Sequence, residues 1–349
     1  MTIYNKTILI TGGCGFIGSH FIHYFLEKNK SYRVINLDLV TYAGSLANLS
    51  KVESNPRYEF VKGDICDFEL VKSIFLRFSI RGVINFAAES HVDNSIKNPG
   101  VFIETNIKGV YTLIDIAYKF WFERPFFYKK KFEGCRFYQI STDEVYGSLP
   151  ESGLFTEESP YAPNSPYSAS KASADMIVRS YHETFGLNTV ITSCSNNYGP
   201  KQHSEKLIPT IIKSVLTGES IPIYGDGKNI RDWLYVLDHC KAIDLVYHVG
   251  KEGELYNIGG NNERTTIQIV EKVCSTLDEI YPLKNHPTAS SYKDFMTFVQ
   301  DRAGHDRRYA IDSSKLQSQL NWKADEDFDT GILKTVVWYL EEYLSQFNS

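Results

Sequence analysis

The sequence has few cysteines and none of the spacing that a disulfide framework or a zinc site requires. No two of them form a Cys-x-x-Cys pair, and they are scattered through the 349 residues as Cys14, Cys66, Cys135, Cys194, Cys240 and Cys274. Secreted scaffolds and structural zinc sites place their cysteines in close pairs instead. We therefore expect a protein of the reducing cytoplasm with no disulfide and no bound metal.

Long apolar runs and an excess of positive charge are also missing. No apolar run approaches the ~18 residues of a membrane-spanning helix, and the short apolar segment after Met1 leaves no room for a signal peptide. The formal net charge of -5 argues against electrostatic binding of nucleic acid. A soluble cytoplasmic protein without membrane or nucleic-acid partners is expected.

The first half of the chain alternates short β-branched segments with longer segments of helical periodicity. This alternation predicts an α/β fold with a Rossmann-type, doubly wound parallel sheet. The expected strands cover residues 7–11, 33–38, 58–62, 82–86, 136–141 and 188–193. The expected helices cover residues 16–28, 68–77, 102–121 and 166–185.

A glycine-rich loop, Thr11-Gly-Gly-Cys-Gly-Phe-Ile-Gly18, follows the first expected strand and opens the first expected helix. Gly12 permits a tight turn, Gly15 lets the backbone approach a pyrophosphate, and Gly18 lets the helix pack closely on the strand. The amino end of the helix then faces the phosphates. This context predicts a dinucleotide-binding site.

Asp38 ends the second expected strand and selects among dinucleotides. Its carboxylate can accept hydrogen bonds from both adenosine ribose hydroxyls and repels a 2′-phosphate, which favours NAD over NADP. An aspartate that caps a turn is the alternative. Asp64 and Ile65, after the third strand, would lie at the adenine edge, although aspartate at a strand end is also common in turns.

The composition of the chain changes after Asn196, where Gly, Pro and Asn separate shorter expected elements. We predict an NAD-binding domain over residues 1–195 and a smaller C-terminal α+β lobe over residues 196–349 that mainly binds substrate. The boundary is soft because residues 232–235 and 255–258 have strand character. These segments, within residues 232–260, could return to the first sheet.

Tyr167 and Lys171 form a Tyr-x-x-x-Lys pattern just after Pro166, so both project from one face of a helix near its first turns. The Lys171 ammonium and an oxidised nicotinamide are expected to favour the ionised form of Tyr167. Such a pair predicts oxidation or reduction of an alcohol. On spacing alone, an exposed helix with an incidental Tyr and Lys is the alternative.

Thr142, Asp143 and Glu144 follow the fifth expected strand, whose carboxyl end should face the nicotinamide. Acids at such positions are often turn formers or helix caps. Two adjacent carboxyl groups in a partly desolvated cleft can instead titrate apart, one remaining an acid and the other a base. The Tyr-Lys pair would oxidise the substrate first, and the two carboxyl groups would then act on it as acid and base. Together the two motifs predict oxidation coupled to elimination.

The order and spacing of these motifs, nearly end to end, resemble those of the nucleotide-sugar 4,6-dehydratases of the extended short-chain dehydrogenase/reductase group. The resemblance rests on residues 11–18, 39–44, 87–93, 141–147, 165–171, 196–200, 205–209, 231–236, 257–260 and 301–309. It implies conversion of dTDP-glucose to dTDP-4-keto-6-deoxyglucose and water, with NAD regenerated in each cycle. A UDP- or other NDP-sugar 4,6-dehydratase, a nucleotide-sugar 4-epimerase and a non-catalytic NAD sensor remain alternatives.

The resemblance also implies roles for individual residues. Tyr167, helped by Thr142 and Lys171, would take the proton of the sugar 4-hydroxyl; Glu144 would take the C5 proton and Asp143 would protonate the departing 6-hydroxyl. The residues that would contact NAD are Gly12, Gly15, Phe16, Ile17, Gly18, Asp38, Leu39, Thr41, Asp64, Ile65, Ala87, Ala88, Ser90, Thr105, Tyr167, Lys171 and Asn197. Those that would bind the nucleotide sugar are Ser90, Thr142, Asn196, Lys206, Leu207, Pro222, Tyr224, Arg231, Arg302 and His305.

Several positions depart from the family pattern on the nucleotide side. This chain has Ala303 where the family usually has proline, and Thr266 where it commonly has asparagine. His203-Ser204 replaces the family's Phe-Pro, and Asn94 replaces an arginine. The family further implies a homodimer packed through residues 102–121 and 166–185. The apolar face offered for it comprises Ile107, Val110, Leu113, Ile114, Ala117 and Ile177, which could equally pack on the chain's own sheet.

Overall fold

The computed structural model describes residues 6–283, 289–301 and 305–347. Its centre is a seven-stranded, fully parallel sheet with the strand order β12-β8-β7-β4-β1-β2-β3. The strands are β1 (Lys6–Thr11), β2 (Tyr32–Asp38), β3 (Tyr58–Lys62), β4 (Gly82–Asn85), β7 (Arg136–Thr142), β8 (Thr189–Cys194) and β12 (Leu255–Ile258). The predicted Rossmann-type sheet is confirmed, because short β-branched segments buried on both faces are what a doubly wound sheet requires.

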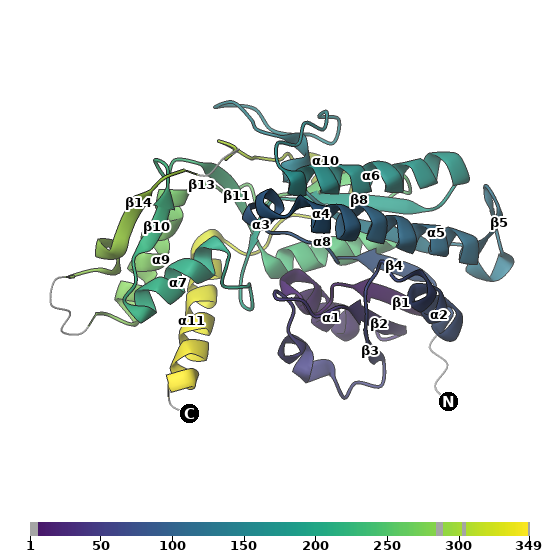
Figure 1. Cartoon of the computed structure of the whole chain (residues 1–349), viewed down its shortest axis with the longest axis horizontal. Coiled ribbons are helices and arrows are strands. Elements are labelled where there is room, and N and C mark those ends of the chain that lie inside the picture. The colour runs from purple at the N-terminus through teal and green to yellow at the C-terminus, as the bar shows by residue number, and fades with distance from the viewer. Residues whose placement is uncertain (1–5, 284–288, 302–304, 348–349) are drawn as a thin grey trace.

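Helices cover both faces of this sheet (Figure 1). One face packs against α1 (Phe16–Lys28) and α8 (Val236–Val249) in one apolar core. The other packs against α2 (Phe68–Phe78), α5 (Val110–Trp121) and α6 (Pro166–Phe185) in a second core. The first and last of these five helices therefore bury their apolar stripes on one face of the sheet, and the three between them on the other.

The helix expected over residues 102–121 is interrupted. It consists of α4 (Pro99–Phe102), a π-helical segment η2 (Ile103–Gly109) and then α5. Buried Asn106 of the π-helical segment bonds the Glu89 backbone at both N and O, and it also donates to Ser170 Oγ at 2.8 Å. Widened turns of this kind re-aim side chains and are frequent at functional sites.

The apolar face offered for the dimer is mostly the chain's own core. Val110, Leu113, Ile114 and Ala117 are at most 1% exposed and pack with Ile177 beneath the sheet. Helical periodicity reported this burial correctly, but it carries no information about which neighbour covers the stripe.

The remaining elements are short. Next to the large sheet lie α3 (Val92–Lys97), α10 (Ser314–Leu320), a β5–β6 ribbon (Phe122–Arg124 and Phe127–Tyr128) and three 3₁₀ turns, η1 (Leu46–Val52), η3 (Lys130–Phe132) and η4 (Asp143–Tyr146). Among the described residues, no helix is both long and apolar enough to span a membrane. All six cysteines are free thiols.

The smaller lobe, at the left of Figure 1, has its own apolar core and mixed α and β structure. It contains β10 (Ile221–Tyr224) paired with β14 (Met296–Val299), and the helices α7 (Leu207–Thr217), α9 (Thr266–Ile280) and α11 (Phe328–Phe347), with the turn η5 (Tyr292–Phe295). A three-stranded sheet of β9 (Asn196–Tyr198), β11 (Ile230–Tyr235) and β13 (Glu263–Thr265) follows the end of β8.

The two segments expected to return to the first sheet behave differently. Residues 255–258 form β12 and pair with β8 in that sheet. Residues 232–235 belong to β11, which pairs with β9 and β13 instead. Strand character alone does not specify the partner, so β11 corrects the expectation, while a division at residue 195 stays a prediction.

Candidate active site

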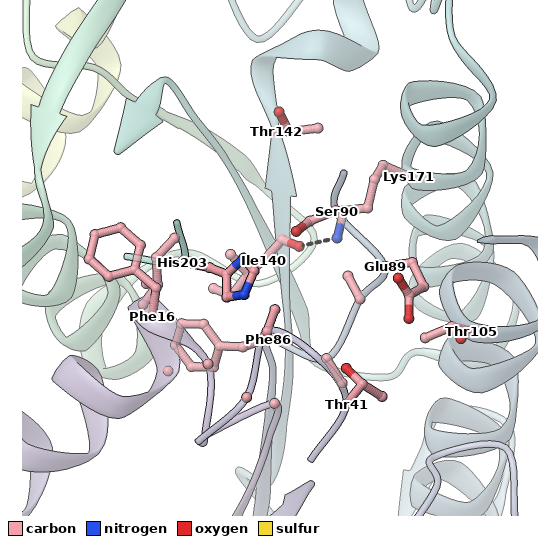
Figure 2. Close-up of a pocket in the computed structure, with 18 of the residues that line it drawn as sticks. Phe16, Thr41, Phe86, Glu89, Ser90, Thr105, Ile140, Thr142, Lys171 and His203 are labelled. Carbon is pink, nitrogen blue, oxygen red and sulfur yellow. Dashed lines mark hydrogen bonds between the residues drawn. The ribbon is translucent and has the colours of Figure 1, made fainter. Parts of the chain in front are cut away.

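A cavity of about 340 Å³ opens at the carboxyl ends of the parallel strands. Figure 2 shows side chains from the glycine loop, from the segment after β4, from the end of β7 and from α6 converging on it. Every residue expected to contact NAD and every residue expected to be catalytic borders this cavity. They are Gly12, Gly15, Phe16, Ile17, Gly18, Asp38, Leu39, Thr41, Asp64, Ile65, Ala87, Ala88, Ser90, Thr105, Thr142, Asp143, Glu144, Tyr167, Lys171 and Asn197.

The glycine loop has the shape that its sequence requires. Gly12 has a φ of +69°, and a Cβ at this position would lie 2.6 Å from the Ala87 backbone nitrogen. A Cβ at Gly18 would lie 2.4 Å from the Gly12 carbonyl oxygen. No side chain fits at either position, so the helix amino end closes tightly on β1 and leaves the backbone accessible from the cavity.

Asp38 borders the cavity and also organises the loops around it. One carboxylate oxygen accepts a hydrogen bond from the Cys14 amide at 2.8 Å, and the other accepts one from the Val40 amide at 2.7 Å. Asp38 therefore stabilises the local turns, as the alternative interpretation expected, and it also borders the cavity. Because each carboxylate oxygen accepts two hydrogen bonds, these contacts leave acceptor capacity toward a ribose.

The amino end of α6 is fixed by local sequence. Ser165 and Ser168 form a reciprocal capping box and Pro166 occupies the first helical turn, an arrangement that stabilises a helix start. Tyr167 and Lys171 follow, 8% and 5% exposed, and the Lys171 ammonium donates to the Ile140 carbonyl oxygen at 2.6 Å (Figure 2).

Burial dominates the ionisation of this pair. It raises the pKa of Tyr167 well above its ordinary value, the charge of Glu144 acts in the same direction, and the Thr142 hydrogen bond opposes both. Burial lowers the pKa of Lys171. Burial therefore disfavours both the Tyr167 phenolate and the Lys171 ammonium, since desolvation penalises charged forms.

The adjacent carboxyl groups lie in different environments. Asp143 is 2% exposed, whereas Glu144 is partly exposed. Asp143 Oδ1 lies 3.4 Å from Thr142 Oγ1, and its buried Oδ2 has no hydrogen-bond partner in the described part of the chain. Burial and then the Glu144 charge raise the pKa of Asp143 well above its usual range, which favours its protonated form.

The residues expected to bind the nucleotide sugar divide into two groups. Ser90, Thr142, Asn196 and Lys206 border the cavity, and Lys206 Nζ donates to the Ser90 carbonyl oxygen at 3.0 Å. Outside the cavity lining are Leu207 at the start of α7, Pro222 and Tyr224 on β10, Arg231 on β11, and His305. Arg302 and Ala303 lie outside the described residues.

Arg231 nevertheless acts on the cavity wall, where its positive charge lowers the pKa of Asp143. Its guanidinium is 4.1 Å from the centre of the Tyr309 ring and donates to the Asp306 carbonyl oxygen at 2.9 Å. The neighbouring Asp232 carboxylate accepts hydrogen bonds from two backbone amides, those of Gly260 and Asn262.

Sequence reasoning missed a polar cluster at the cavity wall. Glu205 Oε2 lies 3.9 Å from His91 Nε2 and 3.7 Å from His203 Nδ1. The His203 ring also makes an edge contact with Tyr42, with ring centres 5.5 Å apart. The sequence placed the two histidines and Glu205 in or beside the motif segments 87–93 and 205–209, but it did not indicate that the two segments meet. The other cavity-lining residues not foreseen are Leu37, Ala43, Gly44, Gly63, Phe86, Glu89, Ile140, Ser141, Cys194, Ser195 and Gln202.

Comparisons with known proteins show the family of this chain. A family model described as GDP-mannose 4,6 dehydratase matches residues 9–335. The chain is 50% identical over 342 residues to the dTDP-glucose 4,6-dehydratase of Salmonella typhimurium, covering 95% of this chain and 92% of the relative. It belongs to the dTDP-glucose 4,6-dehydratase family. The resemblance stated from the motifs is confirmed.

Solved structures of two activities share the fold. The dTDP-glucose 4,6-dehydratase of Streptomyces venezuelae, with NAD and TYD bound, superposes with a TM-score of 0.86 at 42% identity, covering 97% of this chain and 98% of that one. The UDP-glucose 4-epimerase of Thermotoga maritima, with UDP-glucose, gives 0.82 at 27% identity, covering 97% and 100%. Since both activities occur on one fold, the site residues must separate them.

Proposed function

We propose that this chain is a dTDP-glucose 4,6-dehydratase that uses NAD. One observation carries the proposal: a Tyr-Lys pair and two carboxyl groups with unlike environments border the same cavity as a dinucleotide-type glycine loop. An epimerase needs the pair and the loop, but it has no need of an acid and a base for elimination. The glycine positions that exclude a Cβ, together with Asp38, fit NAD. When bound, NAD supplies the hydride acceptor for C4 and the hydride donor for C6.

In the oxidation, Tyr167 takes the proton of the sugar 4-hydroxyl while C4 loses hydride. Thr142 orients this hydroxyl, and the Lys171 ammonium stabilises the resulting phenolate. The resulting 4-ketone acidifies the C5 hydrogen, so that an ordinary carboxylate is basic enough to remove it.

In the elimination, Glu144 removes the C5 proton and Asp143 gives its proton to the departing 6-hydroxyl. Water leaves and a C5–C6 double bond forms. The raised pKa of Asp143 supports the acid role, because it favours the protonated form that a general acid needs. Hydride addition at C6 and proton addition at C5 then complete the 4-keto-6-deoxy sugar.

The test uses the pure protein with dTDP-glucose, UDP-glucose and UDP-N-acetylglucosamine in separate incubations. Mass spectrometry should show loss of water from dTDP-glucose, with the UDP sugars slower. Loss of water only from a UDP sugar would reassign the nucleotide, and an isomer formed without loss of water would identify an epimerase. No change in any incubation would overturn the proposal.

Asp38 gives a prediction about the cofactor. Replacing Asp38 with Ala should weaken NAD binding by about ten- to hundredfold, because a charged hydrogen-bond acceptor contributes roughly 1.5–3 kcal/mol. Fluorescence titration of the NAD-free protein measures this change, and Asp67→Ala, which removes a helix cap elsewhere, serves as the matched control. Equal NAD affinity in the Asp38 variant and the wild type would contradict the assignment.

The homodimer expected from the family remains a proposal, and its interface must use side chains other than the buried stripe. Ile103, Tyr111 and Met176 are 55%, 48% and 52% exposed on the outer sides of η2, α5 and α6. Sedimentation of the wild type should give twice the 39.9 kDa chain mass. The double variant Ile103→Glu, Tyr111→Glu should sediment with the mass of a single chain. Leu76→Glu on α2, also exposed, is the control, and a wild-type monomer at micromolar concentration would contradict the dimer. The cytoplasmic location expected from the sequence is part of the same proposal.

A further inference from the structure

Helix α6 carries a third buried ionisable group that the proposed chemistry does not use. Asp175 lies one turn beyond Lys171 and is 2% exposed. Its Oδ2 accepts hydrogen bonds from Ser141 Oγ at 2.5 Å and from Tyr161 OH at 3.2 Å. Its Oδ1 is buried without a hydrogen-bond partner among the described residues. A carboxylate in such a position is costly unless a positive charge compensates it.

Lys171 supplies that compensating charge. The two residues are spaced i, i+4, so their side chains share one face of the helix. Burial lowers the pKa of Lys171, and the charge of Asp175 raises it again. In the opposite sense, burial raises the pKa of Asp175 to about 6, while Lys171, Ser141 and Tyr161 each lower it.

The other titratable groups around this pair are phenols and a thiol. Tyr161 precedes α6, Tyr146 lies on η4 and has its pKa raised by the Asp175 charge, and Cys194 on β8 acts on Lys171. Burial raises the pKa of all three, so they are neutral at physiological pH. Lys171 is therefore the cation that acts on Asp175.

Asp175 also contacts the end of β7, the strand that leads directly into the carboxyl groups of η4. Ser141 precedes Thr142 at the end of β7, and its hydroxyl donates a hydrogen bond to Asp175. The Lys171 ammonium bonds the carbonyl oxygen of Ile140, the preceding residue of the same strand. Consecutive residues of β7 are thus tied to the two charges of α6, one turn apart.

The structure assigns Asp175 as a positioning residue of the oxidation step: its carboxylate keeps the Lys171 ammonium charged next to Tyr167 and, through Ser141, fixes the end of β7. This assignment rests on the proposed function. Tyr167 needs a charged Lys171 to form its phenolate, and Asp175 is the group that offsets the desolvation of that charge.

The sign of the pH dependence follows from the Asp175 carboxyl. Its pKa of about 6 lies above the ordinary value, so the carboxylate is present at neutral pH and is lost as the pH falls through about 6. Protonation removes the counter-charge of Lys171. The oxidation rate should therefore fall along an acid limb near pH 6.

The experiment isolates the oxidation. With dTDP-6-deoxyglucose, which has no 6-hydroxyl to eliminate, the reaction stops at the 4-ketone and NADH absorbance reports the rate. The wild type should show the acid limb. Asp175→Asn should remove this limb and slow oxidation about tenfold or more at neutral pH. Tyr161→Phe should move the limb to higher pH, because it removes a hydrogen bond that favours the charged carboxylate.

Glu183→Gln is the matched control, since it removes an exposed carboxylate from the same helix, paired with Arg179 at 3.2 Å. It should leave rate and limb unchanged. If the wild type is active and Tyr161→Phe has the same acid limb, the inference is overturned, even if Asp175→Asn does not fold. An Asp175→Asn pH profile equal to that of the wild type would also overturn it. A wild type that forms no ketone from dTDP-6-deoxyglucose and loses no water from dTDP-glucose overturns the proposed function and this inference with it.

Discussion

Glu144→Gln is expected to reduce loss of water from dTDP-glucose by about 10²- to 10⁴-fold, the usual contribution of a general base. Glutamine keeps the size of the side chain and removes its basicity. NAD binding should be nearly unchanged, because the glycine loop and Asp38 lie on other elements of the cavity wall. Oxidation should continue, so the 4-ketone and NADH should accumulate and be visible by absorbance.

The same substitution should change the pH dependence of oxidation. The Glu144 charge contributes to the raised pKa of Tyr167, so its removal should lower that pKa and extend oxidation to lower pH. Glu151→Gln is the control, because Glu151 is an exposed glutamate outside the cavity lining. Wild-type rates of water loss in Glu144→Gln would show that another group takes the C5 proton.

Tyr167→Phe should abolish both oxidation and water loss, although Asp143 and Glu144 are unchanged. Phenylalanine keeps the ring that packs edge-on against Phe102, with ring centres 6.3 Å apart, and removes the hydroxyl that accepts the 4-hydroxyl proton. Without a 4-ketone, the C5 hydrogen is not acidic enough for a carboxylate. We expect a loss of at least about 10²- to 10⁴-fold in both steps, measured as NADH formation and as water loss in single turnovers.

Tyr181→Phe on the same helix is the control for this variant. Its hydroxyl bonds Asp115 at 3.1 Å, away from the cavity, so the loss should lower stability by about 1 kcal/mol and leave turnover intact. Water loss that persists in Tyr167→Phe while NADH formation disappears would separate the two steps and refute the proposed order.

The sequence predicted the central sheet and the cavity well because the relevant signals are local. Short β-branched strands, the glycine loop and the capped start of α6 depend on neighbours within a few residues. Each expected strand of the first sheet lies within one residue of its observed bounds, as with residues 33–38 against Tyr32–Asp38. Parallel strands then bring their carboxyl ends to one edge, which gathers Asp38, Thr142 and the start of α6 into one site.

The misses involve choices between distant partners. The π-helical turn around Asn106 depends on Glu89 and Ser170, the pairing of β11 depends on β9 and β13, and the position of Arg231 depends on Tyr309 and Asp306. None of these contacts produces a periodic pattern in the sequence. Apolar periodicity likewise could not say that Val110 and Leu113 pack on their own sheet.

The sequence by itself determined the chemistry available to this protein: a Tyr-Lys pair, two adjacent carboxyl groups, and a glycine loop with an aspartate after the second strand. Tertiary structure decided how those groups ionise. Burial raises the pKa of Asp143 and of Tyr167, lowers that of Lys171, and brings Asp175 against Ser141. Desolvation depends on everything that packs around a group, and most of that surface comes from residues far away in the chain.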